Sequence, residues 1–464
     1  MQADSRKIIS ENIVADRSKL KIICVFLHRI YFGRIPYERQ YRGKKRKAMN
    51  ITELQQSYAS HPNVEGVCRL LKDNSVRHLY CGGLYASAAS LFSSVLVQRA
   101  TCPLVFILGD MEEAGYFYHD LTQILGTEQV LFFPSSFRRA IKYGQKDAAN
   151  EILRTEVLSR LQKGEEGLCV VTYPDALAEK VVSRKELGEN TLKLHAGERV
   201  DMNFVTDVLR SYGFEYVDYV YEPGQYAVRG SIIDVFSFSS EYPFRIDFFG
   251  DEVESVRTFE VETQLSKEKK ESIVIVPDLS HSLEKKGSGG MVSFLDFLPS
   301  DSLLAMRDFL WLRERIQTVH DESLTPQAIA ARESEENGAI TLEGKLIDGG
   351  EFTLRALDFR RMEFGNKPTG TPDATVSFHT TVQPIFHKNF DMVAESFREY
   401  LSRHYTIYIC SDSLKQTDRI RAIFEDRGDN ISFTAVERTL HEGFADDTLR
   451  ICVFTDHQLF DRFH

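Results

Sequence analysis

A short glycine-containing turn between a predicted strand and a predicted helix lies where a nucleotide-binding loop would do its chemistry. Such a loop requires Gly-x-x-x-x-Gly-Lys-Ser/Thr, because its backbone amides face the phosphates, its lysine contacts the β- and γ-phosphates and its hydroxyl holds Mg²⁺. The run from Gly83 to Ser90 keeps this register, but Ala88 replaces the second glycine and Ala89 replaces the lysine. Without the ammonium group the charge of a triphosphate is uncompensated. We therefore expect a degenerate P-loop without ATP turnover, the alternative being an ordinary strand–helix turn.

A second run of residues predicts a protein-binding surface. Alternate residues of a strand face opposite sides of a sheet, so the run from 241 to 253 has an apolar face and a mixed face. The apolar face carries Phe244, Ile246 and Phe248, and the mixed face carries Arg245, Asp247 and Phe249. An exposed arginine beside an exposed aromatic ring is typical of binding hot spots, and Arg229 lies on a neighbouring predicted strand. The alternative is a surface ion pair between Arg245 and Asp247, with Phe249 tucked under a loop.

On the N-terminal side of these residues, short apolar runs alternate with helical segments. A strand that ends in a turn is predicted at residues 78–83, buried strands at 104–108, 130–133 and 168–171, and helices at 63–71, 87–99 and 147–161. Such alternation indicates a parallel α/β sheet, the skeleton of a nucleotide-binding fold. Asp110 with Glu113 predicts a capping box for the next helix, which explains Asp110 better than a role as the second acid of a nucleotide site.

The pattern changes near residue 189. An amphipathic helix is predicted at 202–212, followed by short antiparallel strands at 214–219, 226–236, 244–249 and 253–261. A buried strand at 272–276 is expected to return to the first domain, so that the antiparallel unit is an insertion. The predicted domains are a basic leader (1–48), an α/β domain in two segments (49–188 and 269–384), the inserted antiparallel α+β domain (189–268) and a small α/β domain (385–464).

Charge is distributed unevenly along the 464 residues. The first 48 residues contain 13 Lys and Arg against four Asp and Glu, and the rest contains 44 against 64, so net charges of +9 and −20 make up the chain's −11. The acidic part of the chain after residue 48 is poorly suited to binding nucleic acid, because such binding needs clustered basic side chains. It suits protein partners better. The leader is expected to be a disordered, dispensable extension upstream of Met49, the alternative being a nucleic-acid-binding arm.

The sequence predicts neither a metal site nor a membrane-spanning helix. The seven cysteines are scattered, without Cys-x-x-Cys pairs or histidine clusters at ligand spacing. We therefore expect free thiols, a reducing cytoplasm and no metal site. No stretch approaches the ~20 apolar residues of a membrane-spanning helix, so no membrane attachment is expected.

The antiparallel unit resembles a known domain over about forty nearly continuous residues. Residues 222–236, 241–257 and 258–264 are similar to the UvrA-binding domain that UvrB shares with the transcription-repair coupling factors (Mfd). Residues 147–154 resemble the first domain of that family and residues 386–464 its small domain, so the resemblance covers roughly residues 60–464. It implies a UvrB-like, RecA-like parallel-sheet domain with a degenerate P-loop, an inserted UvrA-binding domain and a small α/β domain.

Two features favour the coupling factors over UvrB. Their P-loop is degenerate, as it is at residues 83–90, whereas UvrB keeps an intact one. The chain also has no counterpart, between Leu161 and Leu187, of the tyrosine-rich hairpin with which UvrB meets damaged DNA. The resemblance implies that Arg229, Arg245 and Phe249 contact UvrA, in a non-catalytic recruitment module of transcription-coupled nucleotide excision repair.

The other partners that the resemblance implies lie outside this chain. A full-length coupling factor uses ATP and Mg²⁺ in a DNA translocase motor, binds RNA polymerase through a separate domain and masks its UvrA-binding surface with its C-terminal domain. All of these are expected to be missing after His464. Two alternatives remain: an ATP-dependent DNA-repair helicase subunit of the UvrB type, and an intramolecular clamp whose antiparallel domain is occupied by the C-terminal domain of the same polypeptide.

Overall fold

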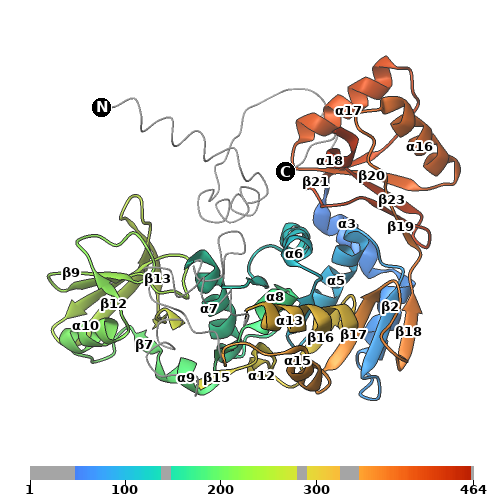
Figure 1. Cartoon of the computed structure of the whole chain (residues 1–464). Helices are drawn as coiled ribbons and strands as arrows, with labels where there is room; N and C mark the ends of the chain where they lie inside the picture. Colours follow the sequence, from blue (N-terminus) through green and yellow to red (C-terminus); the bar gives the residue numbers. More distant parts are fainter. Residues whose placement is uncertain (1–47, 137–147, 280–289, 324–343, 461–464) are drawn as a thin grey trace, which may run out of the picture.

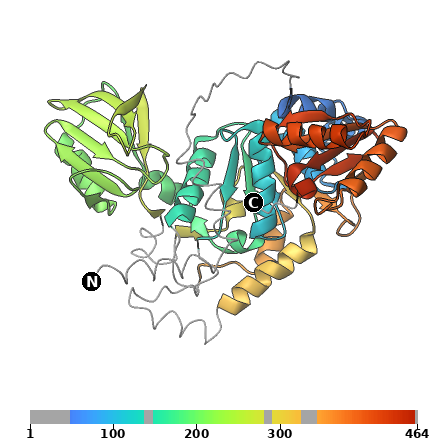
Figure 2. The same ribbon diagram turned by 90° about the horizontal axis from the view of Figure 1, so that it is seen from above.

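The computed structural model describes residues 48–136, 148–279, 290–323 and 344–460. All but the last residue of the predicted leader lies outside these ranges, so the expectations for it stay predictions. Figure 1 shows a central α/β unit with the inserted antiparallel unit at one end and the C-terminal unit at the other, and Figure 2 shows the same order from above. Within the described ranges, no helix has the length and apolar character needed to cross a membrane.

A seven-stranded parallel sheet forms the central unit. Its strands follow the order β18-β2-β17-β16-β3-β5-β4, and every neighbouring pair is parallel. The bounds are β2 His78–Gly82, β3 Leu104–Ile107, β4 Val130–Phe133, β5 Cys169–Thr172, β16 Leu303–Met306, β17 Arg360–Gly365 and β18 Ala374–Ser377. Strands β2, β3, β4, β5 and β16 are buried at every residue, as expected where helices cover both faces of a sheet. The predicted parallel α/β fold is confirmed.

Helices from both segments of the chain pack around this sheet. They are α3 Ile51–Ala59, α4 Pro62–Leu70, α5 Ser87–Arg99, α6 Met111–Leu125, α7 Ala148–Lys163, α8 Pro174–Ala178, α9 Arg184–Glu189, α12 Phe294–Phe297, α13 Phe309–Ser323 and α15 Gly349–Ala356, with a short ribbon of β6 (Val181–Val182) and β15 (Met291–Val292). Asp110 caps α6 as predicted, accepting the Glu113 N–H at 2.9 Å. The prediction of a full capping box is wrong. That motif also needs a hydrogen bond from the Asp110 N–H to the Glu113 carboxylate, which accepts instead from the Gly109 N–H at 2.7 Å.

The inserted unit is a six-stranded sheet in the order β13-β12-β11-β10-β9-β8, antiparallel except for the pair β8–β9. Its strands are β8 Glu215–Tyr216, β9 Gln225–Arg229, β10 Ile232–Val235, β11 Phe244–Phe249, β12 Glu252–Phe259 and β13 Ser266–Lys270. Helix α10 (Met202–Ser211) packs on one face, where its Val205 and Leu209 share a buried cluster with Ile246. The single strand predicted at 226–236 is in fact a hairpin, because Gly230 adopts a φ of 61° and turns the chain.

A two-stranded ribbon joins the insertion to the central unit. Strand β7 (Leu192–His195) pairs antiparallel with β14 (Ser272–Ile275). The prediction that residues 272–276 return to the first domain is wrong for Ile273 and Ile275, which lie in the core of the inserted unit. Val276 lies in the core of the central unit, and the partly buried Val274 packs against that core. The predicted boundary at residue 268 falls inside β13.

The C-terminal unit is a second six-stranded sheet in the order β1-β21-β20-β23-β22-β19. Its elements are β1 Met49–Asn50, β19 Thr380–Val382, α16 Phe390–Ser402, β20 Thr406–Ser411, α17 Leu414–Asp426, β21 Thr434–Glu437, β22 Phe444–Asp446, β23 Ile451–Thr455 and α18 Asp456–Phe460. Strand β1 lies parallel to β21, so the first residues after the leader belong to this sheet and not to the predicted segment 49–188. Strand β19 also precedes the predicted boundary at 385. Val436, Phe444 and Val453 join the buried cluster of the central unit, so the two units share a core.

Candidate functional site

The outer face of the inserted sheet is the face opposite α10. Phe244, Ile246 and Phe248 of β11 are buried in the cluster that includes α10, as the strand alternation predicts. Phe249, at the end of the same strand, is 78% exposed. The turn that follows begins at Gly250, whose φ is 65°. The alternative in which a loop covers Phe249 is therefore wrong.

A buried carboxylate lies between the two candidate arginines. Asp234 of β10 has no exposed surface. Its Oδ1 accepts from Nε of Arg245 at 2.7 Å and its Oδ2 accepts from Nη2 of Arg245 at 2.8 Å. Arg229 donates through Nη2 to the same Oδ2. Asp234 was not among the residues singled out from the sequence, although a charged residue inside the apolar run Ile232 to Val235 is a signal that could have identified it.

Arg245 is held inside the fold. Its side chain is 15% exposed, its Nη1 donates to the carbonyl of Gln264 at 3.1 Å, and its guanidinium carbon lies 4.6 Å from the centre of the Phe259 ring. The hydrogen bond to Asp234 raises the pKa of Arg245 above its ordinary value, so the guanidinium group stays charged. The prediction that Arg245 projects outward beside Phe249 is therefore wrong.

The alternative ion pair between Arg245 and Asp247 is also wrong. Asp247 accepts a hydrogen bond from the Ser255 hydroxyl at 2.7 Å and forms an ion pair with Arg257. These residues lie on the same face, so the outer face carries two separate Arg–Asp clusters. Arg257 was not predicted, because its partner lies on another strand.

Arg229 is the more accessible of the two candidate arginines. Its side chain is 36% exposed, and its guanidinium carbon lies 5.0 Å from the centre of the Tyr219 ring, a cation–π distance. Tyr219 is itself 51% exposed. Among the residues that the structure describes, Nε and Nη1 of Arg229 have no hydrogen-bond partner. Arg229 and Phe249 are therefore the predicted residues that can meet another protein directly.

The run predicted to be a degenerate P-loop begins with a tight turn packed against the rest of the central unit. Gly83 has a φ of 75°, and a Cβ there would collide with the carbonyl group of Phe378, so only glycine fits. Ala88 and Ala89 are buried in the first turn of α5. A lysine at position 89 would have to displace packed side chains before its ammonium group could reach a phosphate.

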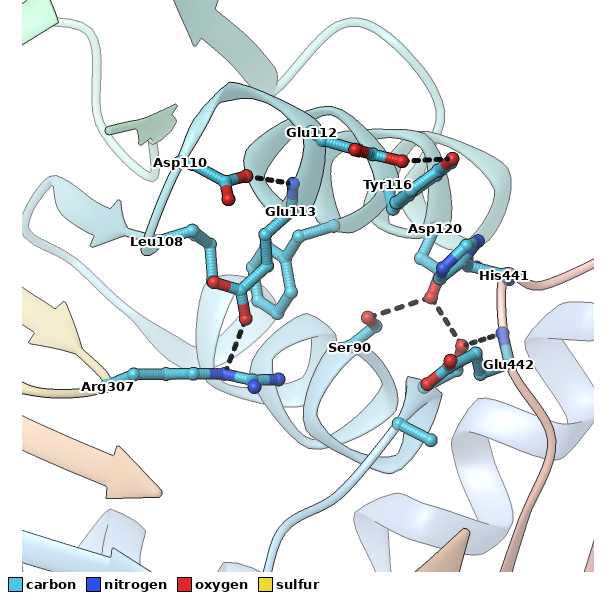
Figure 3. Close-up of a pocket in the computed structure, with 13 residues that line it drawn as sticks. Ser90, Leu108, Asp110, Glu112, Glu113, Tyr116, Asp120, Arg307, His441 and Glu442 are labelled. Atoms are coloured by element: carbon cyan, nitrogen blue, oxygen red, sulfur yellow. Dashed lines mark hydrogen bonds and ion pairs between the residues drawn. The ribbon is translucent and has the colours of Figure 1, made fainter. Parts of the chain in front are cut away.

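A loop of the C-terminal unit covers the N-terminus of α5, where a phosphate would sit in an intact P-loop. The N–H of Ser87 donates to the carbonyl of Glu442 at 3.3 Å, and the N–H of Glu442 donates to the Ser87 hydroxyl at 3.0 Å. Asp120 of α6 accepts from the hydroxyls of Ser87 at 2.6 Å and Ser90 at 2.9 Å, and from the His441 N–H at 2.7 Å. Protein groups thus use the donors that would hold a phosphate (Figure 3).

A pocket of about 300 Å³ lies beside this contact (Figure 3). Its charged lining is mostly acidic: Asp110, Glu112, Glu113, Asp120 and Glu442, against Arg307 and His441. Arg307 is paired with Glu113 at 2.8 Å. Burial lowers the pKa of His441, which stacks on Tyr116 at 3.6 Å between ring centres. The pocket therefore carries net negative charge at neutral pH and repels a triphosphate.

Six cysteines lie in the described ranges and all are free thiols. Burial raises the pKa of Cys81, Cys169, Cys410 and Cys452 far above the ordinary thiol value, so they stay protonated. Within the same ranges, no group of three or more His, Cys, Asp or Glu side chains is arranged to hold a metal ion.

Comparison with known proteins places the inserted unit in a family. Residues 192–281 match the UvrB interaction domain. The chain is also similar to curated transcription-repair-coupling factors: 29% identical over 198 residues to that of Escherichia coli, covering 42% of this chain and 17% of the relative, and 21% identical over 456 residues to that of Bacillus subtilis, covering 82% and 38%. The Haemophilus influenzae relative is 29% identical over 212 residues, covering 45% and 18%. The chain thus spans at most 38% of the length of these relatives.

Proposed function

Because the chain is related to the N-terminal region of the transcription-repair coupling factors and contains a UvrB interaction domain, we propose that it is a recruitment module that binds the excision-repair protein UvrA. The contact surface is the outer face of the inserted sheet, around Phe249 and Arg229. Bound UvrA would bring the excision machinery to the place where the module is held. The exposure of Phe249 at the end of a rigid strand carries this proposal.

An exposed ring of this kind is costly to leave in water and favourable to bury. Phe249 is 78% exposed although the other two phenylalanines of its strand are buried. Large aromatic side chains and arginines supply most of the energy of protein interfaces, because an aromatic ring buries much area and an arginine adds charged hydrogen-bond donors. Arg229 adds a charged donor whose Nε and Nη1 have no hydrogen-bond partner within the described ranges. The surface therefore suits a partner with an apolar pocket beside a carboxylate.

We infer that the module does not hydrolyse ATP, in contrast to a helicase subunit of the UvrB type. The missing lysine is only one reason for this. The first turn of α5 is covered by Glu442, its hydroxyls are bonded to Asp120, and the adjoining pocket is acidic. A nucleotide would have to displace the C-terminal unit and then meet like charge, so several independent features oppose its binding.

The test is a binding titration of the full chain with purified UvrA, comparing the wild type with Phe249→Ala. We expect Phe249→Ala to weaken binding about tenfold or more, because it removes the exposed ring that the partner would bury. Phe204→Ala is a matched control, since Phe204 is 54% exposed on α10, at the opposite face of the sheet. Thermal melts of both variants should match the wild type. Equal affinities of Phe249→Ala and Phe204→Ala would contradict the proposal.

A further inference from the structure

The two arginines of the outer face differ in what they can offer a partner. Arg245 donates through Nε, Nη1 and Nη2 to groups of its own chain and is 15% exposed. Arg229 donates through Nη2 alone among the described residues and is 36% exposed. Within the described ranges, Arg229 thus keeps Nε and Nη1 available for a partner, whereas every nitrogen atom of the Arg245 guanidinium group donates a hydrogen bond within the chain.

The strand register explains why one carboxylate reaches both. Asp234 lies on β10, between β9 and β11, and each of these strands carries one arginine. Asp234 pairs directly with Arg245 across β10–β11, and Arg229 lies opposite Ile232, two residues from Asp234 on the same face. The carboxylate accepts two hydrogen bonds from Arg245 and one from Arg229. Because it is fully buried, these interactions are poorly screened by water.

The close approach of the Arg229 and Arg245 guanidinium groups depends on the negative charge of the Asp234 carboxylate. Two positive groups that share one negative group carry a net charge of +1, and the shared carboxylate offsets their repulsion. An arginine has many rotamers, and fixing them at an interface costs conformational entropy that a preorganised side chain has already lost. The Tyr219 ring, 5.0 Å from the guanidinium carbon of Arg229, is a second contact of this side chain.

We propose that Asp234 is a positioning residue for partner binding. It touches no partner itself, but it fixes the Arg229 guanidinium group in the outward geometry that a partner carboxylate can meet. Arg245 holds the Asp234 carboxylate in place through its two hydrogen bonds. This inference rests on the proposed function and names a residue on which that function depends. It predicts that Asp234 acts on affinity only through Arg229.

The first experiment measures the order of Arg229 without any partner. The side-chain Nε–H resonance of Arg229 in the full chain is assigned by its loss in Arg229→Lys, and its heteronuclear NOE reports fast side-chain motion. We expect a rigid Arg229 side chain in the wild type and a mobile one in Asp234→Asn, which keeps the size of the side chain but loses its charge. A side chain equally rigid in both proteins would overturn the proposal.

The second experiment is a double-mutant cycle in a calorimetric titration with UvrA. We expect Asp234→Asn to weaken binding about as much as Arg229→Ala, about tenfold, and to change affinity less than about twofold in the Arg229→Ala background. Equal losses in both backgrounds would mean that Asp234 acts by another route. Asp207→Asn is the matched control, because Asp207 forms an exposed Arg–Asp pair with Arg210 on α10.

Failure of the proposed function and failure of the inference about Asp234 can be told apart. A wild-type chain that does not bind UvrA refutes the proposed function, while the mobility of Arg229 still decides whether Asp234 orders it. A single variant that loses its fold is replaced by the double variant Asp234→Asn/Arg245→Gln, which removes the buried positive group together with its partner charge. The same mobility and binding measurements then apply to that protein.

Discussion

At the scale of single residues, Arg245 and Arg257 lie directly opposite each other on β11 and β12. Like charges in such positions repel, and each of these two arginines is paired with a different aspartate: Arg245 with Asp234, which it shares with Arg229, and Arg257 with Asp247. The surroundings of the two pairs differ. Arg245 and Asp234 are 15% and 0% exposed, whereas Arg257 and Asp247 are 38% and 14% exposed. The same pair of residue types therefore has a larger structural role at one position than at the other.

Arg245→Ala is expected to destabilise the inserted unit. It leaves the buried carboxylate of Asp234 with Arg229 as its one charged partner among the described residues, and breaking a buried pair costs roughly 3–5 kcal/mol. Arg257→Ala should cost about 1 kcal/mol or less, because its pair is partly solvated. Hydrogen exchange of the β10 and β11 amides measures both. Equal protection in the two variants would contradict this assignment, and any loss of UvrA binding by Arg245→Ala must be corrected for unfolding.

At the scale of elements, α5 begins without a cap of its own. Its N-cap residue Ala86 has no side-chain acceptor and a φ of 49°. Free N–H groups at a helix start must find acceptors, and the carbonyl of Glu442 supplies one from the C-terminal unit. Asp120 ties the same loop to α6 through the N–H of His441. The helix that would bind phosphate in an active P-loop instead helps to hold two units together.

Asp120→Ala should loosen this contact. It leaves two buried hydroxyls and the N–H of His441 without their acceptor, and an unsatisfied buried group costs about 1–3 kcal/mol. Hydrogen exchange at His441 and Glu442 should become faster, together with exchange in the first turn of α5. Glu112→Ala is the control, because Glu112 lies in the same pocket but bonds only to the hydroxyl of Tyr116 among the described residues. Unchanged exchange at His441 in Asp120→Ala would show that other contacts hold the loop.

At the scale of the whole molecule, buried polar contacts join the N-terminal and C-terminal segments of the described chain. Asp446 of β22 accepts from the Tyr58 hydroxyl at 2.9 Å and lies 3.5 Å from Nε2 of His61, and all three side chains are buried. Burial by itself raises the pKa of Asp446, but the nearby His61 ring and the hydrogen bonds from the Leu449 amide and the Tyr58 hydroxyl outweigh it, and the pKa is lowered below its ordinary value. The ionised carboxylate is the form that the fold stabilises.

This shift predicts acid sensitivity of the contact between the units. A carboxyl group whose pKa is lower in the folded chain contributes stability above its unfolded pKa of about 3.9, and that contribution is lost as the pH falls through the folded pKa. Between about pH 5 and pH 3 the wild type should lose urea resistance more steeply than Asp446→Asn, which has no such charge to lose. The urea midpoint of each protein as a function of pH measures this. Parallel curves would exclude Asp446 as the source.

Much of the molecule was determined by local sequence. The apolar runs of the central sheet, the alternation that buries Phe248 and exposes Phe249, the cap at Asp110 and the absent lysine at Ala89 are all properties of a few neighbouring residues. Periodicity and side-chain chemistry act over such short distances, so these features could be predicted.

The tertiary structure alone decided which distant residues meet. Asp234 meets Arg245 through strand pairing, β1 joins a sheet made almost entirely of residues after 380, β7 pairs with β14, and Glu442 caps a helix that starts at Ser87. Each of these contacts joins segments that are separated along the chain by a turn, by tens of residues or by hundreds of residues. No periodicity within one segment specifies its partner, because the pairing depends on how the burial and hydrogen bonding of the whole chain are satisfied together.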